Sequence, residues 1–400
     1  MNQLTLQSTE PRPTSASEPA PARDNSIDWL RGLVMVVMVL DHARDFFFGL
    51  RPSPTDLATT TPVLFATRIV THVCAPTFVF LAGTAAFLYG RKRSPRERSL
   101  FLLTRGLWLV LLEVMVIRLG WIPDLGYHFT LLQVIWAIGW SMLVLAALSR
   151  LPLIAVATFG AAMVLGHNLF DRVQASSWGD FAWLWHVLHQ PGPVTIAPGH
   201  IVMVAYPLVP WIGVMALGFA FGAAFALPAA ERRGLCLRLG VGLVLAFAVI
   251  RGLDGYGDPK PWGQMSSALW TAMSFVNVTK YPPSLAYLCM TLGPALIALS
   301  LAPARADGFW ARPLVVFGRV PLFFYVAHLF LLRYSSAPLG FVRFGAKAFL
   351  PPPQGTGGSP ELGLGMAYLA WLVTLLVLYP ACVWYGRVKA SRAHPLLAYL

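Results

Sequence analysis

The sequence predicts an all-α polytopic membrane protein with about ten transmembrane helices, because its apolar runs are long and uninterrupted. Its 400 residues are 57% hydrophobic and 12% charged, whereas soluble domains are about 45–50% apolar and about 25% charged. The mean hydropathy is +0.63. The four cysteines lie in or beside apolar runs, and this placement excludes a secreted disulfide scaffold.

Each predicted span is an apolar run close to the length of about 20 residues that a helix needs to cross the hydrocarbon core. Transmembrane β-strands would be shorter and would alternate apolar with polar residues, so these runs predict helices, which satisfy their own backbone hydrogen bonds in lipid. In chain order the predicted spans are 29–50, 63–90, 100–118, 129–148, 151–168, 201–228, 235–252, 285–303, 314–334 and 364–386.

The distribution of Lys and Arg predicts the orientation of these spans. Residues 1–27 are rich in Pro, Ser, Ala and Thr without an apolar core, which predicts a disordered cytoplasmic tail rather than a signal peptide. With this tail inside, the inner segments carry fifteen Lys and Arg and the outer loops carry six. The strongest anchor is the basic run 91–98. Both termini are therefore predicted to be cytoplasmic, in a bacterial inner membrane. The net charge of +13 is explained by orientation, and no nucleic-acid partner is expected.

The first span carries most of the charge in the predicted membrane: Arg31, Asp41, His42, Arg44 and Asp45. A charged side chain at the bilayer centre costs about 2.5–3.5 kcal/mol, so each needs a reason. Arg31 and His42 are eleven residues apart, which is about three turns and about 16 Å along one helix face. Arg31 is therefore expected at the cytoplasmic mouth, with His42 beyond the middle of the membrane.

Asp45 follows His42 by three residues and is expected to reach one nitrogen of the imidazole. A carboxylate there would fix the tautomer and make the other nitrogen more basic, which is the arrangement of a general base. The alternative interpretation is that Asp41, Arg44 and Asp45 form only intrahelical ion pairs at the outer end of the span.

Two further spans carry histidines with an arginine. Arg68 and His72 lie four residues apart in the second span, and either line a polar path opposite His42 or belong to a kinked packing helix near Pro76. In the ninth span Arg319 and His328 lie at different depths, and His328 is either a functional group or a core histidine with its hydrogen bonds satisfied.

The outer loops carry aromatic and histidine side chains, namely Trp178, Trp183, Trp185, His186 and His189. These residues either stack against a sugar ring or form an interfacial aromatic belt. The sequence shows neither Cys/His spacing typical of a metal site nor a phosphate-binding glycine loop, so no metal is expected and an ATP-driven pump is disfavoured.

Residues 27–33, Ile-Asp-Trp-Leu-Arg-Gly-Leu, are followed by His42 eleven residues after the arginine. This opening resembles that of the transmembrane acyltransferase superfamily. Within it, the chain is most similar to bacterial members of the heparan-α-glucosaminide N-acetyltransferase-like family. Three further motifs carry the resemblance, which extends over about residues 26–395, at 78–83, 206–213 and 318–328. It implies that residues 28–395 form one transmembrane acyltransferase-like domain.

The resemblance implies a transferase that passes an acetyl or other acyl group from cytoplasmic acyl-CoA, its co-substrate, to a glycan-type acceptor across the membrane. Animal relatives are understood to use a histidine in the loop after the first helix. Residues 43–71 of this chain contain no histidine. His42 instead resembles, by position, the histidine of the related O-acyltransferases. The acceptor group is therefore expected to be an amine or a hydroxyl. Membrane lipids would surround the protein, and a homodimer is possible.

The sequence and the resemblance together suggest roles for seven residues. His42 with Asp45 would act as general base, or His42 as transient acyl carrier. Arg31 and Arg68 would bind the acyl-CoA. The remaining three, His72, His328 and Asp41, would position the acceptor or the thioester. The rival interpretations are a proton-coupled transporter or lipid-carrier permease, in which buried charges relay protons without consuming CoA, and a structural scaffold.

Overall fold

The computed structural model describes residues 24–49, 52–303, 308–349 and 359–391. The chain is 74% helical with 4% strand, which confirms the predicted all-α polytopic class. Seven helical segments of the described residues are long and apolar enough to cross a membrane, and two shorter apolar helices accompany them. The count of about ten spans stays a prediction.

The seven long segments combine consecutive helices in places. They are α2 (Pro62–Thr71) with α3 (Cys74–Gly90), α4 (Pro95–Leu112) with η2 (Glu113–Ile117) and α5 (Arg118–Trp121), α7 (Leu153–Gly166) with η3 (His167–Phe170), α9 (Leu208–Phe221) with η5 (Gly222–Ala226), α10 (Ala229–Leu253), α14 (Pro321–Phe344) with η6 (Gly345–Phe349), and α15 (Leu364–Ser391). The shorter apolar helices are α6 (Val134–Leu148) and α12 (Leu285–Leu301).

The remaining helices and the strands complete the chain. α1 (Ser26–Ala43) continues into the π-helical turn η1 (Arg44–Phe48), and α13 (Ala311–Arg319) precedes α14. Beyond the membrane-length helices lie η4 (Ala175–Phe181), α8 (Ala182–Leu188), α11 (Ala268–Val276) and a sheet of β1 (Phe129–Leu132), β2 (Gly192–Ala197) and β3 (His200–Val204). β3 is the central strand, parallel to β1 and antiparallel to β2.

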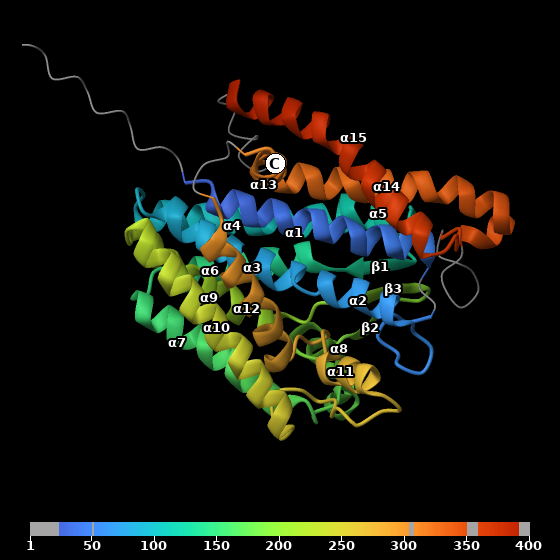
Figure 1. Cartoon of the computed structure of the whole chain (residues 1–400), viewed down its shortest axis with the longest axis horizontal. Helices are drawn as coiled ribbons and strands as arrows, with labels where there is room; N and C mark the ends of the chain where they lie inside the picture. Colours follow the sequence, from blue (N-terminus) through green and yellow to red (C-terminus); the bar gives the residue numbers. More distant parts are fainter. Residues whose placement is uncertain (1–23, 50–51, 304–307, 350–358, 392–400) are drawn as a thin grey trace, which may run out of the picture.

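The long helices lie side by side, with α1 in the interior between α3 and the α14–α15 pair (Figure 1). The strands and the short helices α8 and α11 gather toward the right of the same view, whereas the start of α1 and the end of α15 lie to the left. The two ends of the bundle therefore differ: one has short connections and the basic run 91–98, and the other has the long loops.

Two predicted spans need correction at their first residues, and two others contain a break. Residues 129–132 and 201–204, predicted as helix, are strands that pair with each other, because both segments lie outside the apolar helix and satisfy their backbone groups in a sheet. The predicted span 63–90 breaks after α2 at His72, shortly before Pro76. The predicted span 314–334 breaks at Val320, because Pro321 starts a new helix, which continues to Phe344.

The predicted tail falls almost entirely on residues 1–23, which lie outside the described residues. Its end is corrected by the structure, because α1 begins at Ser26 rather than after residue 27. The basic residues at positions 12, 23, 305 and 392, which support the predicted orientation, likewise lie outside the described part.

Glycines let the central helices approach to backbone contact. A Cβ on Gly83 of α3 would lie 2.1 Å from the carbonyl oxygen of Met215 in α9, and one on Gly218 would lie 2.0 Å from that of Phe80. The Thr84 hydroxyl donates to the Gly218 carbonyl at 2.9 Å across the same contact. Small residues are typical of such close packing in membranes.

We expect Gly83→Ala to destabilise the fold by about 1–3 kcal/mol, because the new methyl group meets backbone atoms and forces the helices apart. The matched control is Gly242→Ala on α10, where a Cβ meets no atom within 4 Å. Thermal unfolding of the two purified variants checks this expectation. Equal unfolding midpoints would show that α3 and α9 accept the added methyl group without a loss of stability.

Candidate active site

A cavity of about 320 Å³ opens between α1, α3, α4, α6 and α14. Four cations line it, and they come from four different helices: Arg31, Arg105, Arg319 and Lys389. The rest of its wall is mostly apolar and includes Met35, Met38, Leu109, Val134, Ile138 and Leu322. A mainly apolar pocket with a few convergent polar groups is the usual form of a small-molecule site.

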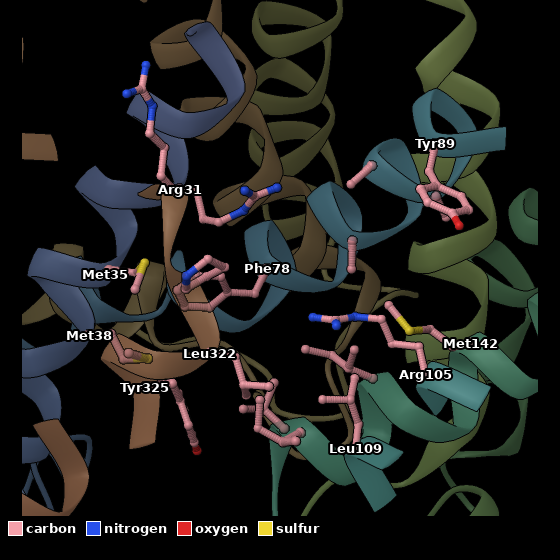
Figure 2. A pocket seen from close by; sticks show the side chains of 18 of the residues that line it. Arg31, Met35, Met38, Phe78, Tyr89, Arg105, Leu109, Met142, Leu322 and Tyr325 are labelled. Atoms are coloured by element: carbon pink, nitrogen blue, oxygen red, sulfur yellow. The ribbon is translucent and has the colours of Figure 1, made fainter. Parts of the chain in front are cut away.

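The cavity is polarised along α1. Arg31 and Tyr325 lie at opposite ends in Figure 2, and Met35 and Met38 lie between them. Arg31 donates to the Gly318 carbonyl at 3.0 Å and pairs with Asp28 at 3.3 Å, so its guanidinium is held at the end of the bundle where α1 begins. The cationic end therefore faces the side that the sequence predicts to be cytoplasmic.

His42 lies one helical turn beyond Met38, next to Tyr325 at the inner end of the cavity. Its Nδ1 is 2.7 Å from Nε2 of His328, and both residues are buried. The other nitrogen of His328, Nδ1, lies 3.0 Å from the carbonyl oxygen of Phe324. A carbonyl only accepts, so His328 carries its proton on Nδ1, and His42 must donate from Nδ1.

This assignment leaves Nε2 of His42 unprotonated. The chain of hydrogen bonds runs from His42 through His328 to the Phe324 carbonyl, and it fixes the tautomer of His42 as a carboxylate does in other histidine bases. His42 is thereby oriented with one basic nitrogen free to take a proton.

Two buried hydrogen-bond donors adjoin His42. The Trp121 ring meets the imidazole edge-on at 4.9 Å between centroids, and the Tyr325 ring does so at 6.3 Å. The indole Nε1 of Trp121 faces the hydroxyl oxygen of Tyr325, and both atoms are buried with no other polar partner among the described residues. The Tyr325 proton is left without an acceptor, and because an unpaired buried donor costs about 1–3 kcal/mol, it is suited to a group that arrives with a substrate.

Asp41 is the centre of a separate polar cluster. The guanidinium of Arg68 donates to both of its carboxylate oxygens, at 2.7 and 2.5 Å, and the Thr71 hydroxyl donates to it at 2.9 Å. Arg44 adds an ion pair at 3.0 Å. The cluster ties α1 to α2, and Arg68 does not line the cavity that holds Arg31.

Asp45 does not take the predicted place beside His42. Its carboxylate pairs with Arg44 at 2.5 Å, and no hydrogen bond joins it to His42 in the described part of the chain. The reason is the change from α-helix to π-helix at Arg44. The wider π turn takes residues three apart off a common face. His328, which is 286 residues away, supplies the partner instead.

The other predicted histidine, His72, lies in the break between α2 and α3. It is 2% exposed, its ring meets that of Tyr287 at 5.4 Å, and its carbonyl accepts from the Tyr287 hydroxyl at 2.8 Å. Its Nδ1 has no partner among the described residues. His72 is close to the Asp41 cluster through Thr71, but it does not line the cavity.

Sequence reasoning did not place Arg105, Lys389, Trp121 or Tyr325 in the site. Arg105 lies within an apolar run, which is a usable signal, because a charge in the membrane needs a reason. Lys389 belongs to the basic segment after the last predicted span, where it counts only toward the predicted orientation. The two aromatic residues give no such signal, since Trp and Tyr are common in membrane helices near interfaces.

The fold defines a polytopic membrane protein. Its cavity is lined by four cations, and a polar site that contains His42 adjoins its inner end. The sequence model of the family described as heparan-alpha-glucosaminide N-acetyltransferase, catalytic, matches residues 23–250, which is more than half of the chain. The chain belongs to this family and is a membrane transferase of the acyltransferase type. No curated protein is significantly similar to it. Tyr325, His328 and Lys389 lie beyond the matched residues.

Proposed function

We propose that the protein transfers an acetyl or other acyl group from cytoplasmic acyl-CoA to the amine or hydroxyl of a sugar on the far side of the membrane. The observation that carries this proposal is one cavity lined by four cations, with Tyr325 in its wall and the His42–His328 pair beside Tyr325. Membership in the family supports the acyl-transfer chemistry.

The residues of the cavity fit an acyl-CoA. The guanidinium groups of Arg31, Arg105 and Arg319 match phosphate oxygens in pairs, and Lys389 adds a point charge. The apolar wall beyond them suits the thin pantetheine arm, which would carry the thioester toward Tyr325. In this proposal Arg68 has a different role from the one expected, because Asp41 already occupies its guanidinium.

His42 would act at the thioester as general base. As the acceptor nitrogen or oxygen attacks the carbonyl carbon, Nε2 of His42 takes its proton, and the C–S bond breaks. The same nitrogen then returns the proton to the departing CoA sulfur. Tyr325 and Trp121 would donate hydrogen bonds to the carbonyl oxygen as negative charge develops there. His328 would hold His42 in the required tautomer.

The acceptor would approach from the Asp41 cluster, next to His42 in the chain and on the side opposite to Arg31. We propose that Asp41, with Arg68 and Thr71, shapes this approach and that His72 binds an acceptor hydroxyl through its unpartnered Nδ1. Asp45 would then act only through Arg44, as a counter-charge beside Asp41.

The first test is thermal unfolding of the detergent-purified protein with and without acetyl-CoA. A ligand at 100 times its dissociation constant stabilises a protein by about 2.7 kcal/mol. We expect this stabilisation for wild type and a smaller one for Arg31→Ala, because a charge-assisted hydrogen bond contributes about 1.5–3 kcal/mol. The matched control is Arg172→Ala, which makes the same charge change at an exposed site in the opposite loops.

A stabilisation that depends on Arg31 and not on Arg172 supports the donor site. If folded wild-type protein shows no shift with acetyl-CoA or with longer acyl-CoAs, the proposal is wrong. Substrate movement that requires a proton gradient and consumes no CoA would then identify a transporter.

A further inference from the structure

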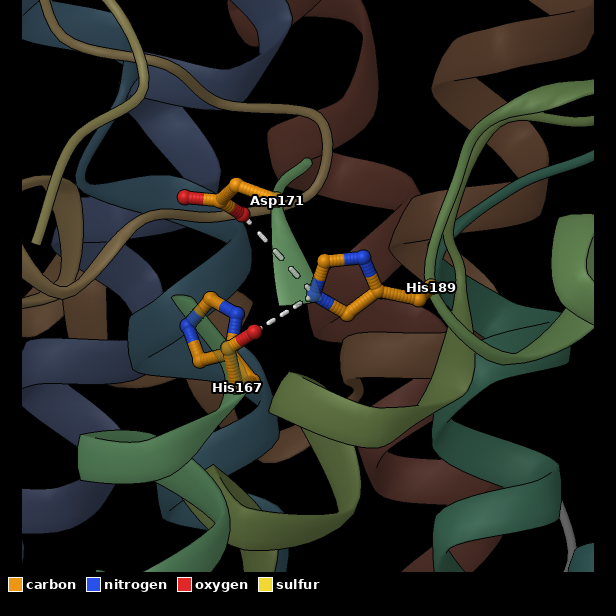
Figure 3. Close-up of side chains that lie close together, drawn as sticks. All are labelled: His167, Asp171 and His189. Carbon is orange, nitrogen blue, oxygen red and sulfur yellow. Dashed lines mark hydrogen bonds and ion pairs between the residues drawn. The ribbon is translucent and has the colours of Figure 1, made fainter. Parts of the chain in front are cut away.

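A second cluster of polar side chains lies far from the cavity, among the long loops. His167 and Asp171 belong to η3 and the residue after it, and His189 follows the last residue of α8. Their ligand atoms all lie within 4.8 Å of one another. Figure 3 shows the two imidazoles and the carboxylate converging on one space.

His167 is buried without any hydrogen bond to its ring. It is 1% exposed, and neither Nδ1 nor Nε2 has a partner among the described residues. A neutral imidazole always offers one donor and one acceptor, so both are unsatisfied here. Burial of unpaired polar groups costs about 1–3 kcal/mol each, which points to a ligand that these atoms bind.

The other two side chains are held in place by their surroundings. Asp171 Oδ2 accepts from the Asn168 amide at 2.8 Å, which leaves Oδ1 directed toward His189 at 3.9 Å. His189 stacks on Trp185 with ring centroids 5.2 Å apart. Orientation of ligands by such neighbouring groups is a regular feature of metal sites.

We propose that His167, Asp171 and His189 bind a divalent transition-metal ion, with Zn²⁺ as the best match. Two imidazoles and one carboxylate are a known zinc ligand set, with a water in the fourth position of the tetrahedron. Zn–N and Zn–O distances of about 2.0–2.2 Å require the three ligand atoms to move about 1 Å closer together than they are here.

The tautomer of His189 must change for the metal to bind. Nε2 of His189 donates to the His167 carbonyl at 2.9 Å in the structure. Binding through this nitrogen breaks that hydrogen bond, and the proton leaves Nε2 for solvent while Nδ1 takes one up, so the ring binds the metal as a neutral imidazole. The ion would link η3, at the end of α7, to the end of α8, which lies 22 positions further along the chain. This structural role does not depend on the proposed acyl transfer.

The test is metal titration of the full-length protein, purified in detergent with a tag that contains no histidine and stripped with a chelator. We expect one Zn²⁺ per chain by elemental analysis, and Co²⁺ in its place to give the visible absorption of a tetrahedral site. His167→Ala, Asp171→Asn and His189→Ala should each weaken binding by at least about tenfold, the lower end of the loss that even a second-shell change causes.

Two controls separate this cluster from other histidines. His186 lies on α8, three residues before His189, and His186→Ala should bind Zn²⁺ like wild type. The paired surface rings of His128 and His200, 5.4 Å apart, are the site where Zn²⁺ would bind adventitiously. If wild type binds less than stoichiometric Zn²⁺, or if His128→Ala loses the ion and Asp171→Asn keeps it, the proposal is overturned. The conservative Asp171→Asn variant makes the test valid even where an alanine variant fails to fold.

Discussion

Replacing His42 by alanine is expected to lower the turnover of acyl transfer by about 10²–10⁴-fold, the usual contribution of a general base. The reason is that His42 presents one unprotonated nitrogen, while the other is bound to His328 at 2.7 Å. The measurement is CoA release in proteoliposomes supplied with acetyl-CoA outside and an amino sugar or a sugar alcohol inside, on wild type and His42→Ala.

His186→Ala, at a histidine of α8 remote from the cavity, is the control and should keep the wild-type rate. His42→Ala must also keep its stabilisation by acetyl-CoA, since the cationic mouth is about 16 Å away along the helix. If the variant retains more than about a tenth of the wild-type rate, His42 contributes less than a general base does, and the assignment fails.

His328 is a positioning residue in this scheme, and its variants separate a tautomer effect from a packing effect. His328→Gln retains an acceptor for the Nδ1 proton of His42, whereas His328→Ala removes it. We expect the glutamine variant to recover a substantial part of the activity that the alanine variant loses. Equal loss in both variants would indicate that His328 only packs.

Removing the hydroxyl of Tyr325 with Tyr325→Phe is expected to lower kcat by about 10²–10³-fold, the cost of losing one oxyanion donor. The hydroxyl is buried with no polar neighbour except the Trp121 indole among the described residues, and the ring lines the cavity beside His42. Because the hydrogen bond forms with charge that develops in the transition state, the KM for acetyl-CoA should change little. Steady-state kinetics in the same proteoliposomes measure both constants.

Tyr385→Phe is the matched control for this substitution. Its hydroxyl is also buried without a partner among the described residues, but its ring stacks on Phe323 in the contact between α14 and α15. We expect Tyr385→Phe to leave kcat unchanged. If the two variants behave alike, the Tyr325 hydroxyl has no special relation to the reaction, and Trp121 alone would have to supply the donor.

Much of the helical fold could be predicted from local sequence. The apolar runs predict the long helices, because a backbone in lipid must satisfy its hydrogen bonds within the segment. The runs do not reveal the short sheet, since Phe129–Leu132 and His200–Val204 are as apolar as the helices that follow them. Their pairing joins segments that local pattern cannot connect.

The candidate site, like the fold, could be predicted from the sequence only in part. The position of Arg31 at the mouth and His42 deeper on α1 follows from an eleven-residue spacing on a regular helix. The expectation for Asp45 failed because the helix changes to a π turn at Arg44, which spacing rules do not anticipate. The proposed metal site was not predicted, because His167 and His189 are 22 positions apart and have no metal-type spacing.

The sequence by itself determined that this is an all-α membrane protein of the heparan-α-glucosaminide N-acetyltransferase family with charged groups inside its first span. Only the tertiary structure decided which partners those groups have. Periodicity specifies the face of a helix on which a residue lies, but not the helix that faces it. His328 therefore meets His42, and Arg68 is bound to Asp41 rather than to the donor cavity, through helix packing alone. The same packing brings Lys389 and Arg105 into the wall of the cavity that Arg31 lines.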